Sequence, residues 1–221
     1  MASTQTETQI GPTGPHRART LIHSPGLTAR DHFLRGRVPE ELSTEFTVAS
    51  GATFRLRPIR PDDAEKLVAF HACLSFDSIY RRYFSLHPTL SADEVRHFTQ
   101  VDYVDRLALV IEDGDQLVAV GRYDRYPNAT TAEVAFVVRD DHQHLGLGRR
   151  LFDALAEAAW ERGITTLCAE TLFTNHDMMS VFRHSGFPIT TTSEFGAISV
   201  RLSIEPSSRE RLPRDLVAPT A

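Results

Sequence analysis

A glycine-containing loop between a strand and a helix constrains the fold of this 221-residue chain more than any other segment. Thr131–Val138 shows little alternation of polar and apolar residues, which predicts a central strand covered on both faces. Gly146 and Gly148 follow, and Leu147–Arg162 carries the apolar stripe of an amphipathic helix that ends at Gly163. Backbone N–H groups at such a helix start are unpaired and lie at the positive end of the helix dipole, so they favour a phosphate. The alternative is a β–α turn whose glycines serve only the backbone geometry.

Two common nucleotide-binding patterns do not fit this loop. The phosphate-binding loop of many NTPases ends in Gly-Lys-Ser/Thr, which is absent here. The dinucleotide-binding fingerprint requires a third glycine, at a position where this chain has Leu151. A different kind of anion-binding loop is therefore expected.

The rest of the middle of the chain alternates between strand and helix patterns. Asp113-Gly114-Asp115 and Ser50-Gly51 are turn signals that predict two hairpins, formed by Leu107–Ile111 with Gln116–Tyr123 and by Thr47–Ser50 with Thr53–Ile59. Further helices are expected at residues 61–74, 75–84, 91–101 and 175–184, and further strands at 164–171, 187–192 and 197–204. This order of elements predicts a mixed α/β layer fold.

Composition separates the two ends from the middle. Residues 1–50 are expected to form an N-terminal extension whose first ~20 residues are disordered, and residues 205–221 a disordered tail. Residues 51–204 form the predicted folded domain. No apolar run approaches the ~18 residues that cross a membrane, and the start lacks a secretory signal, so we expect no membrane contact.

Charge and cysteine content narrow the class of protein further. Cys73 and Cys168 are too few for a disulfide framework, which favours the reducing cytoplasm. The formal net charge of −5 argues against a nucleic-acid-binding domain and favours a cationic partner. His142 and His144 flank Gln143, but no separate cluster of ligand residues completes a recognisable site, so no metal is expected.

Three motifs resemble those of the GNAT superfamily of acyl-CoA-dependent N-acetyltransferases. Gln143-x-x-Gly146-x-Gly148 after a strand is similar to its pyrophosphate loop, Q/R-x-x-G-x-G/A. Arg57–Asp63 resembles its first strand and helix start, and Asn175 with Met178, Met179 and Gly186-Phe187 resembles its last motif. The resemblance spans about residues 53–204. It implies a mixed, mostly antiparallel central sheet of about seven strands, with helices on both faces and a splayed central strand pair.

A narrower resemblance points to one branch of that superfamily. Tyr80–Phe84, Val101–Asp105 and Ala132–Phe136 are similar to the acetyltransferase domain of bacterial Pat-type protein-lysine acetyltransferases. In those proteins the domain accompanies a regulatory or synthetase-like domain, and we expect neither within these 221 residues.

The resemblance also implies a set of residues that bind acetyl-CoA as co-substrate. The backbone of Phe136, Val137 and Val138 is expected to hold the thioester carbonyl and the pantetheine. The pyrophosphate is expected to lie against Gln143, His144, Leu145, Gly146, Leu147, Gly148 and Arg149. Asn175 is expected to contact the pantetheine, although a helix N-cap would explain it equally. Arg183 either reaches the adenosine phosphates or is an ordinary solvated helix residue.

Attack of an amine on a thioester needs a group that takes the amine's proton. The resemblance places that general base at Glu133, and its apolar neighbours in sequence would raise its pKa. A solvent-facing or arginine-paired strand glutamate is the alternative reading, and Glu170 on the next strand is a rival base. Many GNAT enzymes have a tyrosine where this chain has Phe182, so no general acid is assigned.

Three functions remain open at this stage. The first is a protein-lysine N-acetyltransferase, the second an enzyme that acetylates a small amine such as an amino acid, polyamine or drug, and the third a non-catalytic acyl-CoA-binding module. The sequence does not fix the oligomeric state or the preferred acyl chain.

Overall fold

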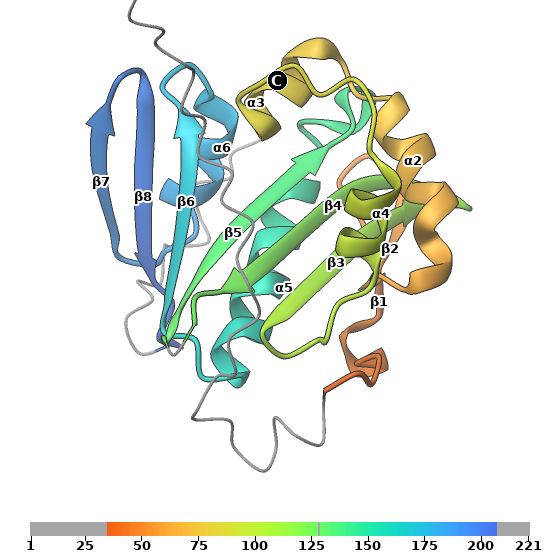
Figure 1. Ribbon diagram of the computed structural model, residues 1–221, viewed down its shortest axis with the longest axis horizontal. Helices are drawn as coiled ribbons and strands as arrows, with labels where there is room; N and C mark the ends of the chain where they lie inside the picture. Colours follow the sequence, from red (N-terminus) through yellow and green to blue (C-terminus); the bar gives the residue numbers. More distant parts are fainter. Residues whose placement is uncertain (1–34, 128, 207–221) are drawn as a thin grey trace, which may run out of the picture.

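The computed structural model describes residues 35–127 and 129–206, and an eight-stranded sheet forms its centre. The strand order is β1-β2-β3-β4-β5-β6-β8-β7, and every neighbouring pair is antiparallel except β5 and β6 (Figure 1). The strands are β1 (Thr44–Thr47), β2 (Thr53–Pro58), β3 (Arg106–Asp113), β4 (Gln116–Arg125), β5 (Thr131–Val138), β6 (Thr166–Leu172), β7 (Ile189–Glu194) and β8 (Ala197–Ser203). The mixed, mostly antiparallel sheet predicted from the sequence is confirmed, with eight strands instead of about seven.

The sheet begins earlier in the chain than the sequence indicated. β1 starts at Thr44, whereas the predicted strand was Thr47–Ser50, so the last part of the 1–50 segment belongs to the sheet. The predicted disorder of the first ~20 residues and most of the predicted C-terminal tail lie outside the described residues.

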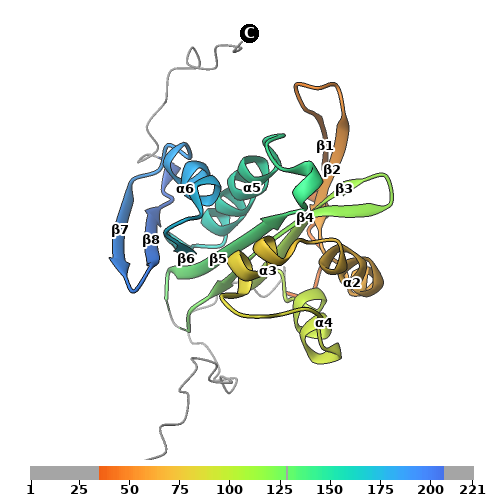
Figure 2. The same ribbon diagram turned by 90° about the horizontal axis from the view of Figure 1, so that it is seen from above.

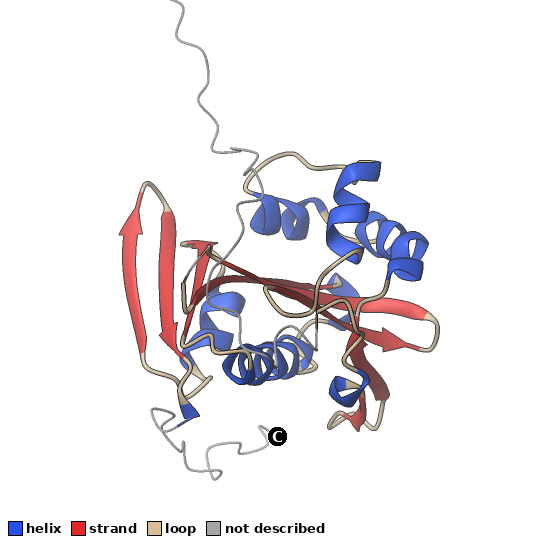
Figure 3. Ribbon diagram, turned by 60° about the horizontal axis from the view of Figure 1, so that its bottom comes forward, coloured by secondary structure: helices blue, strands red, loops and turns tan. Residues whose placement is uncertain are grey.

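Helices cover both faces of the sheet, as Figures 2 and 3 show. Helices α2 (Ala64–Ala72), α3 (Phe76–Tyr83) and α4 (Ala92–Thr99) lie on one face, and α5 (Leu147–Glu161) and α6 (His176–Arg183) on the other. Short 3-10 helices span Glu40–Leu42, Pro61–Asp63 and Asp140–His142. The helix expected from residue 91 is present as α4 and begins with a capping box, because the Ser91 N–H donates to Glu94 Oε2 at 2.8 Å and the Glu94 N–H to Ser91 Oγ at 3.3 Å.

The long helix α5 packs its apolar stripe directly onto the middle of the sheet. Leu151, Phe152 and Leu155 are fully buried. Gly121 of β4 lies beneath them, and a Cβ atom at that position would come within 2.9 Å of both Leu151 Cδ2 and Leu155 Cδ1. The glycine therefore allows α5 to lie close to β4.

β5 and β6 are paired at one end only. Three residue pairs join them, ending at Glu133↔Cys168, and the two strands then diverge (Figure 1). The predicted splayed strand pair is thus present. From Val134 to Val138, β5 is paired to β4 alone.

The predicted cover on both faces of β5 is present along part of the strand and is missing at Glu133. Ala132, Val134 and Phe136 are buried on the α5 side, but Glu133 on the opposite side is exposed. The opposite face carries only the shorter helices α2 to α4, and β6 no longer flanks β5 beyond Glu133. Apart from Thr131 and Glu133 the strand is apolar, so its sequence could not reveal this difference in cover.

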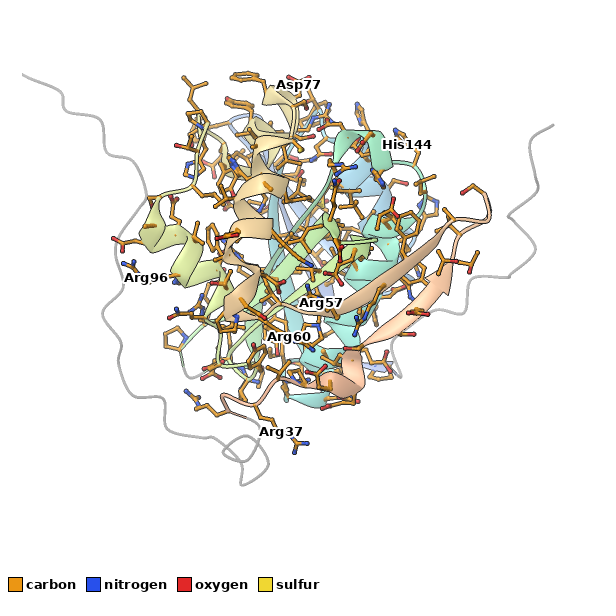
Figure 4. The ribbon with its side chains drawn as sticks, turned by 90° about the vertical axis from the view of Figure 1, so that its right-hand side faces the viewer. Arg37, Arg57, Arg60, Asp77, Arg96 and His144 are labelled. Atoms are coloured by element: carbon orange, nitrogen blue, oxygen red, sulfur yellow. The ribbon has the colours of Figure 1, made fainter. Side chains whose placement is uncertain are left out.

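A buried charge cluster links β2, β3 and α2. Arg57, near the centre of Figure 4, donates to Glu112 at 2.9 and 2.6 Å and to Asp63 at 2.7 and 2.6 Å. Lys66 Nζ lies 3.0 Å from Glu112 Oε1. Burial alone would raise the pKa of the Glu112 carboxyl, but the hydrogen bonds from Arg57 and Lys66 outweigh it and lower that pKa to about 2.

Candidate functional site

A cleft of about 240 Å³ opens where β5 and β6 diverge. The start of α5, helix α6 and the C-terminal half of α3 form its other walls. Ten of the thirteen predicted site residues line it, namely Phe136, Val137, Val138, Gln143, His144, Gly146, Leu147, Gly148, Arg149 and Asn175. Glu133, Leu145 and Arg183 do not, and Leu145 packs against the hydrophobic core instead. The sequence thus predicted most of the cleft wall that is formed by β5, the loop after it and the start of α5.

The loop before α5 presents unpaired backbone N–H groups to this cleft. Gly146 has a φ of +81°, a conformation that favours glycine. The first hydrogen bond of the helix runs from the Arg150 N–H to the Gly146 carbonyl at 3.0 Å. The N–H groups of Leu147, Gly148 and Arg149 consequently have no acceptor within the helix. Unpaired N–H groups at the positive end of a helix dipole are chemically suited to an anion.

The open edge of β5 forms the adjoining wall. The Arg139 N–H donates to the Val118 carbonyl at 2.8 Å, toward β4. Because successive N–H groups of a strand point in opposite directions, those of Phe136 and Val138 point toward the opening and that of Val137 toward β4. Only alternate residues of the predicted carbonyl-binding segment can therefore donate into the cleft.

Asp140 holds helix α3 against the loop. Its carboxylate accepts hydrogen bonds from the Ser75 N–H at 2.8 Å, Ser75 Oγ at 2.6 Å and Ser78 Oγ at 2.8 Å. Desolvation would raise the pKa of the Asp140 carboxyl, and these hydrogen bonds together lower it. Gln143 Nε2 lies beside them, 3.2 Å from the Val138 carbonyl oxygen and 3.4 Å from Ser78 Oγ.

Of the three arginines on α5 and α6 near the cleft, Arg149 lines it, whereas Arg150 and Arg183 do not. Arg149 Nε donates to Asp153 at 2.8 Å, and its guanidinium also bonds to the carbonyl of His184 at the end of α6. Arg150 lies over the ring of Phe46, 5.1 Å from its centroid, on the β1 side. Arg183 is exposed on α6 and lies outside the cleft lining.

Sequence reasoning missed two basic residues of the site. Arg81 and Arg82 on α3 line the cleft, and Arg81 lies 3.7 Å from Asp177 of α6. The sequence marks this segment only through a family resemblance, because no local pattern tells which side chains of α3 face β5.

Asn175, at the start of α6, and Phe182, within α6, each have a structural role. Asn175 is buried and its Oδ1 accepts the Met178 N–H at 3.2 Å, so it does cap α6, and it also lines the cleft. Phe182 is completely buried, with its ring centroid 5.9 Å from that of Phe136 and 5.4 Å from that of Phe152. This ring belongs to the core, and it offers no proton.

Glu133 lies at the last residue pair before the strands diverge, but not in apolar surroundings as expected. Its side chain is exposed, and we find no hydrogen bond or ion pair to its carboxylate among residues 35–127 and 129–206. Its cross-strand neighbour Asp124 is already paired, with Arg106 at 2.9 Å and Arg122 at 3.3 Å. Glu170 is exposed on the same face of the sheet, two residues beyond Cys168.

Neither a metal centre nor a membrane span is found within the described part of the chain. No three His, Cys, Asp or Glu side chains gather there in a way that could hold a metal ion. None of the described helices has the length and apolar character to cross a bilayer.

Comparison with known proteins identifies the family. The model of the Acetyltransferase (GNAT) family matches residues 73–187, just over half of the chain. The chain belongs to the GNAT acetyltransferase family. Acetyl-CoA is accordingly its acetyl donor, and the unpaired N–H groups of the α5 start and of β5 fit the phosphates and amides of such a ligand.

Individual relatives agree with this assignment. Acetyltransferase Pat of Mycolicibacterium smegmatis is 31% identical over 193 residues, 85% of this chain and 57% of that protein. The chain thus spans little more than half the length of that relative. The crystal structure of the GNAT domain of S. lividans PAT has a TM-score of 0.71 and 38% identity, covering 75% of this chain and 98% of that one. The structure of yncA from Salmonella typhimurium with its cofactor acetyl-CoA has the same fold, with a TM-score of 0.56 and 18% identity over 72% of this chain and 99% of that one.

Proposed function

We propose that the protein transfers the acetyl group of acetyl-CoA to the side-chain amine of a protein lysine, with Glu133 as general base. The observation that carries the proposal is the position of Glu133, at the apex of the opening between β5 and β6 and on the strand that forms the cleft wall. The likeness to Acetyltransferase Pat supports a protein substrate.

The chemistry needs a proton acceptor near the thioester. A lysine amine, with a pKa of ~10.4, is mostly protonated at pH 7, and only its neutral form attacks a carbonyl. The amine nitrogen bonds to the thioester carbonyl carbon of acetyl-CoA, the C–S bond breaks, and CoA leaves as its thiolate, which takes a proton from water; with a thiol pKa of ~8.5 it can leave without a strong acid. The Glu133 carboxylate, which no described group holds, is available to accept the amine's proton directly or through water.

Backbone N–H groups are suited to bind acetyl-CoA. We assign the N–H groups of Phe136 and Val138 to the thioester carbonyl and the pantetheine amides, because they point into the opening. The N–H groups of Leu147, Gly148 and Arg149 are assigned to the pyrophosphate. Asn175 lines the same cleft and is assigned to the pantetheine.

Radiolabelled acetyl-CoA and a deacetylated lysate of the source cell provide the test. Label in discrete protein bands is expected, and label confined to the small-molecule fraction would replace the lysine proposal with a metabolite acetyltransferase. Self-labelling is a minor background, because Lys66 is the single lysine and its amine is paired with Glu112.

Matched glutamate variants test the base. Glu133→Gln should lower turnover by about 10²-fold or more while thermal stabilisation by acetyl-CoA is kept. Glu157→Gln, an exposed position on α5, serves as the control and should leave both unchanged. A large loss in Glu170→Gln with normal turnover in Glu133→Gln would move the base to β6.

A further inference from the structure

A second pocket lies on the other side of β5, beneath α2, α3 and α4. Its floor is apolar and includes Leu67, Phe70 and Leu74 from the α2 region and Val120, Ala135 and Val137 from the strands. Val137 and Arg82 line both this pocket and the cleft. The two spaces therefore adjoin at β5, where the proposed reaction takes place.

Two guanidinium groups, Arg82 from α3 and Arg122 from β4, face this pocket. The Arg122 guanidinium lies 4.1 Å from the ring centroid of Phe98, and the side chain is 24% exposed. Its carboxylate neighbour Asp124 is shared with Arg106. Arg82 lies 5.2 Å from the ring centroid of Tyr83, and within the described residues no carboxylate pairs with it. The pocket thus holds more positive than negative charge.

The two charges act on each other. Burial, followed by the nearby charge of Arg82, lowers the pKa of Arg122 to about 10. Asp124, 3.3 Å from Arg122, offsets only part of this repulsion because Arg106 shares its carboxylate. A further carboxylate would offset more of it, since a guanidinium binds a carboxylate with two parallel hydrogen bonds.

The pocket lies on the same face of β5 as Glu133. Ala135 is the cross-strand partner of Arg122, and Glu133 is two residues before it, which is roughly 6.6 Å along a strand. An acceptor whose amine lies at Glu133 can therefore place its aliphatic part on Ala135 and Val137 and a further group beside the arginines.

We propose that this pocket recognises a carboxylate that the acceptor carries close to its reactive amine, with Arg82 as the contacting residue and Arg122 behind it. The proposal rests on the N-acetyltransferase function above and names the class of acceptor. The carboxylate can belong to an acidic residue next to the acceptor lysine in a protein or to the α-carboxylate of a free amino acid. The chain's negative net charge would not by itself select such an acceptor.

Paired substrates at saturating acetyl-CoA test this proposal. Lysine peptides that differ only in Asp or Asn beside the lysine form the first pair, and free lysine and lysine amide the second. The carboxylate-bearing member of at least one pair should have a kcat/KM about tenfold higher or more. The pair that shows the preference identifies the source of the carboxylate. Acetylation of both members of both pairs at equal rates would overturn the pocket's role and leave the enzymatic function standing. No acetylation of any amine would contradict the function itself.

Variants connect the preference to the pocket. Arg82→Gln should reduce the ratio of the two kcat/KM values toward one, and Arg82→Lys should keep part of it. Arg96→Gln removes an arginine at the outer edge of α4 (Figure 4) and should leave the ratio unchanged. The ratio is insensitive to weaker donor binding or to a smaller folded fraction, because both affect the two substrates equally. An unchanged ratio in Arg82→Gln would overturn the assignment.

Discussion

Replacing Glu112 with glutamine should destabilise the protein by an amount that depends on pH. Glu112 is buried and accepts hydrogen bonds from both Arg57 and Lys66. Its pKa is about 2 in the folded protein, against 4.5 for an ordinary glutamate. A shift of this size corresponds to about 3 kcal/mol of folding free energy at pH 7. For a chain of this length that is about 6–12 °C in Tm.

The sign of the pH dependence follows from the direction of the shift. Because the folded-state pKa is the lower one, the stabilisation is fully present above pH 4.5 and is lost as the pH falls through about 2. The difference between wild type and Glu112→Gln should therefore be about 3 kcal/mol at pH 7 and about half of that at pH 3.

Urea unfolding followed by circular dichroism at pH 7, 5, 4 and 3 measures this difference. Glu45→Gln, an exposed position on β1, is the control and should change the free energy of unfolding by less than about 0.5 kcal/mol. A loss below about 1 kcal/mol at pH 7 in Glu112→Gln, or a loss that is the same at pH 3 and pH 7, would refute the reasoning.

Three further predictions concern the core and the cleft. Leu155→Ala should cost about 2–5 kcal/mol in urea unfolding, because the side chain is completely buried between α5 and the sheet. Gly121→Ala should cost about 1–3 kcal/mol, because the added Cβ comes within 2.9 Å of Leu151 and Leu155; a neutral effect would mean that α5 can move away freely. Asp140→Asn should raise the KM for acetyl-CoA several-fold in steady-state assays, because it weakens the bonds that hold α3 over the cleft; an unchanged KM would show that α3 keeps its place without them.

Much of the fold could be predicted because its signals are local. The capping box at Ser91 and Glu94 depends on residues three apart, and the hairpin of β3 and β4 on the Asp113-Gly114-Asp115 turn. The loop from β5 to α5 likewise carries its glycines within a few residues. Ten of the predicted site residues line the cleft, and most of them belong to this one segment, which is why the sequence could identify them.

The remaining features depend on contacts between distant segments. Arg82 and Arg122 lie forty positions apart in the chain and come to line one pocket only when α3 packs onto the sheet. The exposure of Glu133 depends on where β6 leaves β5, and the apolar neighbours of Glu133 in sequence gave the opposite expectation. Arg150 lies over Phe46 because β1 extends the sheet on that side, beyond the strand boundary that the sequence indicated.

The narrow junction between β5 and β6 has a mechanical consequence. Strands β1 to β5 form one hydrogen-bonded part of the sheet, and β6, β8 and β7 form the other. Only three residue pairs between β5 and β6 join the two parts. Opening this seam breaks few hydrogen bonds, so it is the place where the sheet can separate at least cost. A donor molecule whose amides pair with β5 adds rungs where the protein has none. Amide hydrogen exchange at Phe136 and Val138 should therefore slow on donor binding far more than exchange at the junction of β2 and β3.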